Sequence, residues 1–184
     1  MKRCAWANPN NPLYLAYHDN EWGQVCHDEL RLFEMLNLEG AQAGLSWETV
    51  LNKRENYRLA FDQWDAEKIA CYDEHKVAAL LANPGIIRNR LKIAAVISNA
   101  KAYLQMRAAG LSLDSYFWSY VEYRPIVNNG ARIITTPISD QISKDLKKRG
   151  FKFVGLTIIY AYMQAIGMVN DHEADCYCKQ QISA

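Results

Sequence analysis

The sequence predicts an all-α protein, and three observations support this. Apolar residues recur at helical spacing through most of the chain, aspartates and glycines stand where helices would begin and end, and there is no sustained alternation of apolar and polar residues. Half of the 184 residues are hydrophobic, which is enough for a packed core. We therefore expect a single helical domain over residues 1–184.

In the first half, an apolar stripe over residues 28–38 predicts the first helix. Ser46 is a suitable N-cap for a second helix, which carries Trp47, Val50, Leu51 and Tyr57. Two short helices are expected after Asp65 and Asp73, because an aspartate side chain can accept hydrogen bonds from the first free N–H groups of a helix.

In the second half, further helices are expected at residues 89–108, 113–121, 139–149 and 156–166. Gly110, Gly150 and Gly167 follow three of them at the position where helices commonly end in a left-handed residue. Residues 126–138 are expected to form an irregular loop, with a turn at Asn129-Gly130.

Composition excludes several classes of protein. No apolar run approaches the roughly 18 residues needed to cross a bilayer, and no signal peptide is recognised. Five cysteines at irregular spacing do not indicate a disulfide framework, so we expect a reducing, cytoplasmic location. The net charge of +1 gives no argument for nucleic-acid binding, which must rest on local charge.

The two ends of the chain carry matching halves of a metal site. Cys4 and His18 lie near the start, and His172 and Cys176 near the finish, spaced i and i+4. Two cysteines and two histidines suit Zn²⁺, and an ion with four protein ligands is structural rather than catalytic. The spacing leaves two alternatives open, since Cys178 is a competing ligand and Cys26-His27 is a second possible pair.

A helical hairpin is predicted around Pro84-Gly85, within an element of about residues 74–108. The basic residues Arg88, Arg90 and Lys92 follow at the start of the next helix. Backbone N–H groups at a helix start, beside arginines, suit a DNA phosphate, so Gly85 is a candidate backbone contact together with the two arginines. The alternative is an ordinary αα-hairpin with a solvated basic edge. A second basic cluster occurs at residues 147–152.

The N-terminal quarter is rich in aromatic residues, namely Trp6, Tyr14, Tyr17, Trp22 and Trp47. Clustered aromatic rings can hold a flat heterocycle, as in enzymes that take a base out of the DNA stack. The alternative is that these side chains belong to the core.

Glu39 lies on the apolar stripe of the first predicted helix, where a carboxylate is costly unless it has a partner or a task. It precedes a loop that contains Gly40 and Gly44, which permits close approach of a ligand. We interpret Glu39 as a ligand-recognition residue; the alternative is an ion-paired glutamate at a helix end.

Taken together, these segments resemble the DNA-3-methyladenine glycosylase I family of bacterial base-excision repair enzymes. The stretches that carry the resemblance are residues 3–6, 17–23, 38–40, 42–47, 85–90, 147–155 and 169–172. The most specific are Tyr-His-Asp-Asn-Glu-Trp-Gly at 17–23 and Leu-Glu-Gly, Gly-Leu-Ser-Trp within 38–47.

The resemblance implies a helix-hairpin-helix glycosylase that flips and hydrolytically excises 3-methyladenine from double-stranded DNA. It implies one structural zinc at the four ligands named above. The implied base pocket contains Glu39, Tyr17 and Trp47, with Trp6, Tyr14 and Trp22 close by. The loop that contains Gln42, Gly44 and Leu45 is implied to probe the duplex where the base has left. A monomer suits an enzyme that grips one lesion.

The expected chemistry is hydrolysis without a lyase step. No acidic residue occurs between Glu74 and Asp114, so there is no aspartate just beyond the hairpin to stabilise a sugar cation. The substrate explains this absence, because 3-methyladenine in DNA is positively charged and leaves as a neutral base. Two other classes remain as alternatives: a zinc-stabilised nucleic-acid-binding module without catalysis, and a zinc hydrolase with an open metal position.

Overall fold

A computed structural model describes residues 1–128 and 132–182, with side chains up to residue 179. The protein is predominantly helical, which confirms the predicted class. The helices are α1 (Pro12–Asn20), α2 (Glu29–Ala41), α3 (Trp47–Leu51), α4 (Arg54–Ala60), α5 (Ala66–Ala70), α6 (Glu74–Ala82), α7 (Arg90–Ala108), α8 (Leu113–Ser119), α9 (Pro137–Lys148), α10 (Leu156–Ala165) and α11 (Tyr177–Ile182), with a 3-10 turn η1 (Asp62–Trp64). Among the described residues, no helix has the length and apolarity needed to span a membrane.

The predicted caps Ser46, Asp65 and Asp73 are confirmed, since the side chain of each accepts a hydrogen bond from a backbone N–H group of the helix that follows. Asp28, which was not predicted as a cap, does the same at the start of α2. One helix differs from the prediction, because the segment after Ser46 breaks between α3 and α4. The break directs Arg54 to Glu34 on α2, where the guanidinium and the carboxylate form a buried ion pair at 2.9 Å.

Several elements were not predicted. The outer helices α1 and α11 lack a strong apolar stripe; α1 begins instead because the Asn11 side chain caps two N–H groups and Pro12 occupies the first turn. The loop expected at residues 126–138 contains strand β1 (Ile126–Val127), which pairs in parallel with β2 (Val169–Asn170). Strands of two residues are too short to show a period. The predicted turn at Asn129-Gly130 lies outside the described residues.

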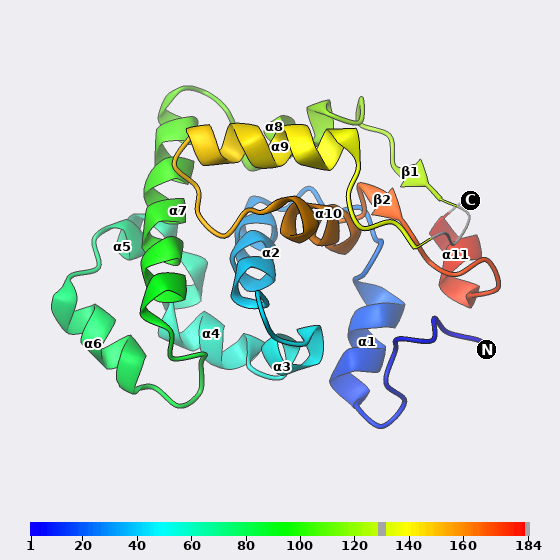
Figure 1. Ribbon diagram of the computed structural model, residues 1–184, viewed down its shortest axis with the longest axis horizontal. Helices are drawn as coiled ribbons and strands as arrows, with labels where there is room; N and C mark the ends of the chain where they lie inside the picture. Colours follow the sequence, from blue (N-terminus) through cyan, green and yellow to red (C-terminus); the bar gives the residue numbers. More distant parts are fainter. Residues whose placement is uncertain (129–131, 183–184) are drawn as a thin grey trace.

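Helix α2 lies at the centre of the molecule, with α7, α8 and α10 packed around it (Figure 1). Residues 32–41 are all buried, so charged side chains in this stretch need a partner. Glu34 has partners in Arg54 and Arg58, whereas Glu39 in the last turn has no ion pair with any residue that the structure describes.

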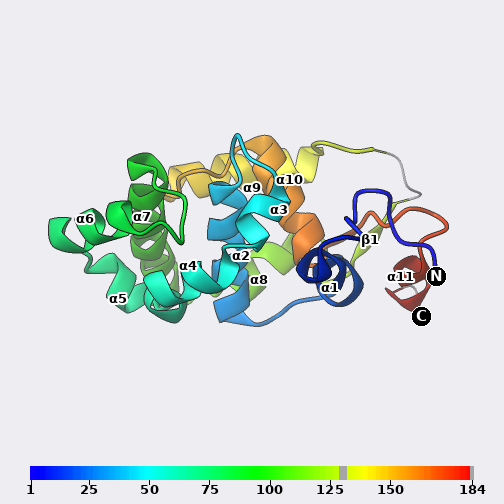
Figure 2. The same ribbon diagram turned by 90° about the horizontal axis from the view of Figure 1, so that it is seen from below.

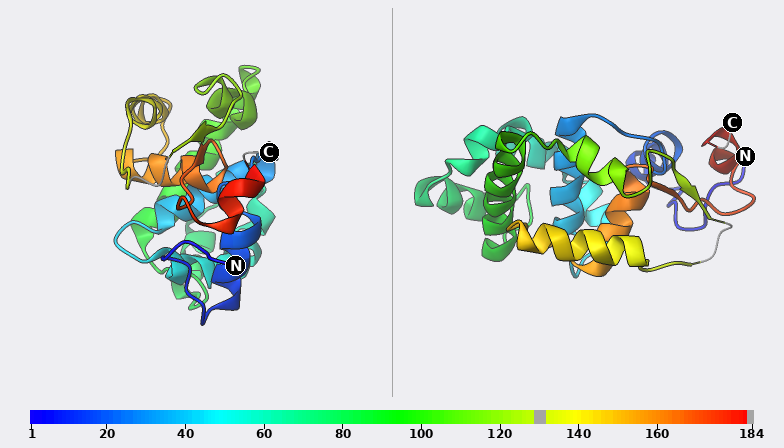
Figure 3. Two further views of the ribbon diagram at one scale, coloured as in Figure 1. Left: turned by 90° about the vertical axis from the view of Figure 1, so that its right-hand side faces the viewer. Right: turned by 90° about the horizontal axis from the view of Figure 1, so that it is seen from above.

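The two ends of the chain meet at one end of the molecule, away from α5, α6 and α7 (Figures 2 and 3). The N–H of Tyr177 in α11 donates to the carbonyl of Lys2 at 3.0 Å. This arrangement brings the predicted metal ligands of both termini together next to α1.

Candidate active site

A cavity of about 700 Å³ opens between α1, the end of α2, the start of α3 and α10. Its lining residues are Ala5, Trp6, Tyr14, Tyr17, Trp22, Glu39, Gln42, Trp47, Arg132, Ile133, Ala161, Gln164, Asp171 and Glu173. The structure thus brings into one pocket the predicted acid, all five predicted aromatic residues and Gln42. A cavity of this size is ample for a single purine base.

Glu39 lines the pocket from the last turn of α2 and is 4% exposed. Burial alone raises the pKa of its carboxyl from 4.5 to about 8. No hydrogen bond or ion pair to the carboxyl is formed within the described residues. A buried acid without a protein partner, beside a cavity, is a candidate for binding a ligand.

The aromatic side chains form the walls around this acid. Tyr17 is buried, and its ring lies 5.2 Å from that of Trp47 between centroids, at 45°. Burial, followed by the charge of Glu39, raises the pKa of the Tyr17 hydroxyl well above its ordinary value. The buried Trp47 Nε1–H has no hydrogen-bond acceptor in the described part of the chain.

A second set of rings connects the pocket to the termini. The Trp6 ring lies 5.3 Å from that of Tyr14, 4.9 Å from that of Trp22 and 5.0 Å from that of His18. Trp22 in turn lies 4.6 Å from His172. Trp6 and Trp22 therefore belong both to the pocket wall and to the surroundings of the two histidines, so that ordering the histidines also orders the wall.

A buried cluster of possible metal ligands lies beside this wall. His18, His172, Cys176 and Cys178 each offer one ligand atom, and these atoms lie within 4.8 Å of one another. The Nδ1 of His18 is 2.8 Å from Asp19, and the Nδ1 of His172 is 2.9 Å from Asn170. The buried Nε2 of His172 has no partner among the described residues, whereas the Nε2 of His18 accepts a hydrogen bond from the backbone N–H of Cys4 at 3.2 Å.

Cys4 was predicted from the sequence as one of the four metal ligands, with Cys178 as the alternative cysteine. The set that lies within 4.8 Å contains Cys178 and not Cys4. Cys4 is nevertheless adjacent, since its backbone N–H lies 3.2 Å from the Nε2 of His18. Burial, together with the neighbouring Cys176 thiol, raises the pKa of Cys4 to about 12. The other pair considered, Cys26-His27, lies elsewhere: His27 contacts Asp114 at 2.5 Å.

The residues of this cluster fit a soft divalent ion, because imidazole nitrogens and cysteine sulfurs converge there and all four residues are buried. Burial lowers the pKa of His172 to about 4, so its imidazole is in the neutral, ligating form. All four residues of the cluster are buried, and the cluster could hold a metal ion.

The loop of residues 42–45 lies between the pocket and solvent. Gln42 lines the pocket, while Gly44 (φ +76°) and Leu45 (40% exposed) lie beyond it. An added Cβ on Gly44 would meet no atom within 4 Å, so the loop tip is in open space and needs its glycine for the backbone angle alone.

The hairpin between α6 and α7 is partly as expected. Arg88 and Arg90 are exposed, and Arg90 pairs with Glu74 at 3.4 Å. The Gly85 N–H, however, donates to the Asn83 side chain at 2.8 Å. A Cβ on Gly85 would come within 3.2 Å of the Asn56 and Asn83 side chains, so the chain is closely packed at this position.

Sequence reasoning missed four polar residues of the pocket, namely Arg132, Gln164, Asp171 and Glu173. Asp171 accepts hydrogen bonds from Asn128, Tyr160 and Gln164 at 2.6–2.7 Å, which fixes it at the pocket wall. The only signal in the sequence was the position of Asp171 and Glu173 on either side of a proposed metal ligand.

Comparison with known proteins agrees with this geometry. A family model described as methyladenine glycosylase matches residues 6–180. DNA-3-methyladenine glycosylase 1 of Escherichia coli is 53% identical over 182 residues, covering 97% of both chains.

Two solved structures are also similar. A crystal structure of 3-methyladenine DNA glycosylase I has a TM-score of 0.93 and 54% identity, covering 96% of this chain and 99% of that one. A variant of such an enzyme in complex with 3-methyladenine has a TM-score of 0.91 and 37% identity, covering 97% and 98%. The chain belongs to the methyladenine glycosylase family.

Proposed function

We propose that this protein is a monofunctional DNA glycosylase that flips 3-methyladenine out of alkylated double-stranded DNA and hydrolyses its N-glycosidic bond. The single observation that carries the proposal is the unpartnered, buried carboxyl of Glu39 in a pocket with aromatic walls. Family membership supports the reaction, and the related protein in complex with 3-methyladenine supports the choice of base.

Glu39 is the recognition residue. In the free protein its carboxyl is largely protonated at neutral pH, because its pKa is about 8. The lesion in DNA carries a positive charge, and its entry into the pocket favours the ionised carboxylate. The carboxylate then accepts hydrogen bonds from the exocyclic amine and the ring edge of the base. An unmodified adenine brings no charge and does not compensate the cost of ionising Glu39.

Tyr17 and Trp47 hold the plane of the base. Their rings stack on or abut the flipped purine, and attraction between a cationic ring and aromatic faces favours the methylated base. The charged base departs in neutral form, so the protein needs little leaving-group protonation. Water completes the hydrolysis, and in the absence of an assigned lysine nucleophile we expect no lyase step.

On the DNA side, we assign probing of the vacated stack to the loop with Gln42, Gly44 and Leu45. The exposed tip and the position beside the pocket support this assignment. We assign backbone contacts to Arg88 and Arg90 in the hairpin element of about residues 74–108, with Gly85 shaping the turn. Both arginines are exposed at the start of α7, where a phosphate is favoured.

We further propose one structural Zn²⁺ held by Cys4, His18, His172 and Cys176. In both histidines the Nδ1 atom contacts a neighbouring side chain, Asp19 or Asn170, and Nε2 lies on the opposite side of the ring. The Cys176 sulfur lies 3.5 Å from the Nε2 of His18. The Cys178 sulfur lies 3.9 Å from Nδ1 of His18, the nitrogen already bound to Asp19, which favours Cys4 as the fourth ligand. The ion would compensate the buried thiolates and join the termini, and Trp6 and Trp22 would thereby be held in the pocket wall.

We propose that residues 1–184 act as one glycosylase domain, as a monomer in the cytoplasm. The proposed activity is tested by incubating the protein with methylated duplex DNA and separating the released bases by chromatography. We expect 3-methyladenine to be released, little 7-methylguanine, and an abasic strand that stays intact until alkali is added. A folded protein that binds DNA without releasing any base would instead support the non-catalytic alternative.

A further inference from the structure

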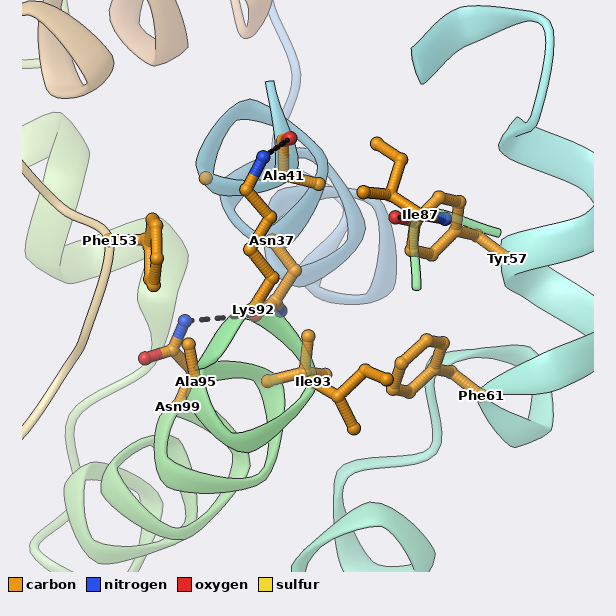
Figure 4. Close-up of a pocket in the computed structure, with 12 residues that line it drawn as sticks. Asn37, Ala41, Tyr57, Phe61, Ile87, Lys92, Ile93, Ala95, Asn99 and Phe153 are labelled. Carbon is orange, nitrogen blue, oxygen red and sulfur yellow. Dashed lines mark hydrogen bonds between the residues drawn. The ribbon is translucent and has the colours of Figure 1, made fainter. Parts of the chain in front are cut away.

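Lys92 differs from the other basic residues near the hairpin. It lies in the first turn of α7, yet its side chain is half-buried and runs to the end of α2 (Figure 4). Its Nζ donates to the carbonyl of Ala41 at 2.8 Å and to that of Ala43 at 2.7 Å. Lys92 is thus occupied within the protein, in contrast to the exposed Arg88.

The contact is well matched electrostatically. The last carbonyls of a helix lack partners within the helix and carry a partial negative charge, which an ammonium group compensates. Partial burial disfavours the charged form of Lys92, and it lowers the pKa of the amine below its ordinary value. A lysine held at this cost, rather than left in solvent, indicates that the contact has a task.

The other hydrogen bonds to the loop of residues 42–45 indicate what this task is. The remaining hydrogen bonds to residues 42–45 are local backbone bonds, including that from Leu45 to Gln42 at 2.7 Å. In the described part of the chain, Lys92 makes the only side-chain hydrogen bond to these four residues. The space beside Gly44 is open, since a Cβ added there would meet no atom within 4 Å, and Lys92 is therefore the side chain through which the rest of the protein can hold this loop.

We propose that Lys92 is a positioning residue that couples the hairpin to the loop of residues 42–45. Because Lys92 and Arg88 lie within four residues of each other, gripping the DNA backbone at the hairpin fixes the start of α7. Lys92 transmits that position to the carbonyl of Ala43, and so sets where the loop meets the duplex. This inference rests on the proposed glycosylase function and on the probing role of the loop.

The test compares Lys92→Met, which keeps most of the apolar stem, with Lys92→Arg, which keeps a donating cation. Lys101→Met is the matched control, since Lys101 is exposed on the same helix. Four quantities are measured: the single-turnover rate of 3-methyladenine excision from DNA, affinity for free 3-methyladenine, hydrogen exchange in residues 42–45, and the salt dependence of binding to undamaged DNA.

For Lys92→Met we expect excision to slow about ten-fold, as when one charge-assisted hydrogen bond that positions a working group is lost. Exchange in residues 42–45 should accelerate, while free-base affinity and the salt slope stay as in wild type. Lys92→Arg should recover part of the rate, and Lys101→Met should match wild type throughout.

Three results would overturn the inference while wild type remains active. Excision by Lys92→Met at the wild-type rate would show that Lys92 does not position the loop for excision. If Lys92→Met reduced the slope of log affinity for undamaged DNA against log salt by about one, Lys92 would be a phosphate contact instead. An equal fall in free-base affinity and excision would make it a general structural residue. If wild type itself releases no 3-methyladenine, the proposed function fails first, and this is seen without any variant.

Discussion

Replacing Glu39 by glutamine should make the folded protein more stable at alkaline pH. Glutamine has nearly the same shape as a protonated glutamate but cannot ionise. In wild type, the carboxyl has a pKa of about 8 in the folded state and an ordinary value of 4.5 when exposed. The folded state therefore holds this proton more tightly, so wild type loses stability as pH rises from 4.5 towards 8.

The magnitude follows from the two pKa values. Each pH unit between them corresponds to about 1.4 kcal/mol, so ionising Glu39 in the folded protein costs about 5 kcal/mol once the pH exceeds 8. At pH 5 the same group contributes less than about 1 kcal/mol. The stability advantage of Glu39→Gln should therefore grow by about 4 kcal/mol between pH 5 and pH 9.

The assay is denaturant unfolding of both proteins at pH 5, 7 and 9, followed by circular dichroism in the absence of DNA. Glu67→Gln is the control for the substitution itself, because the Glu67 side chain is 71% exposed. A Glu39→Gln advantage that stays constant from pH 5 to pH 9 would refute the reasoning, since it would mean that Glu39 is ionised or solvated in the free pocket.

Three further predictions concern the metal, the stacking wall and the DNA grip. Cys4→Ser should lose bound zinc and lower the melting temperature, whereas Cys178→Ser should retain zinc in elemental analysis; the reverse pattern would assign Cys178 as the ligand. Trp47→Leu should weaken binding of free 3-methyladenine by about ten-fold or more, the effect of one lost stacking contact, as measured by titration calorimetry. Arg88→Gln should reduce the slope of log affinity for undamaged DNA against log salt by about 0.9, and an unchanged slope would exclude a phosphate contact.

The helical framework was predictable because its signals are local. Ser46, Asp65 and Asp73 mark helix starts by chemistry that depends on a few neighbouring residues. Long-range features were not accessible in this way. The pairing of β1 with β2 joins residues more than forty positions apart, and two residues give no period to read.

The residues of the candidate site also fall into those that a local signal predicts and those that depend on long-range packing. Glu39 could be selected because a carboxylate on an apolar stripe is a local anomaly, and the structure places it in the pocket. The roles of Lys92 and Asp171 could not be predicted, because they depend on which partners the fold supplies. Lys92 was grouped with the hairpin arginines, but only the packing of α7 on α2 shows that its ammonium serves a loop 49 positions away.

The most direct test of the central claim is the single-turnover rate of 3-methyladenine release from methylated duplex DNA, measured for wild type and Glu39→Gln side by side. If Glu39 recognises the cationic base, wild type releases 3-methyladenine and the glutamine variant is slower by about ten-fold or more, the loss expected when a charged hydrogen-bond partner is neutralised. Equal rates in the two proteins, each folded and binding DNA, would contradict the account.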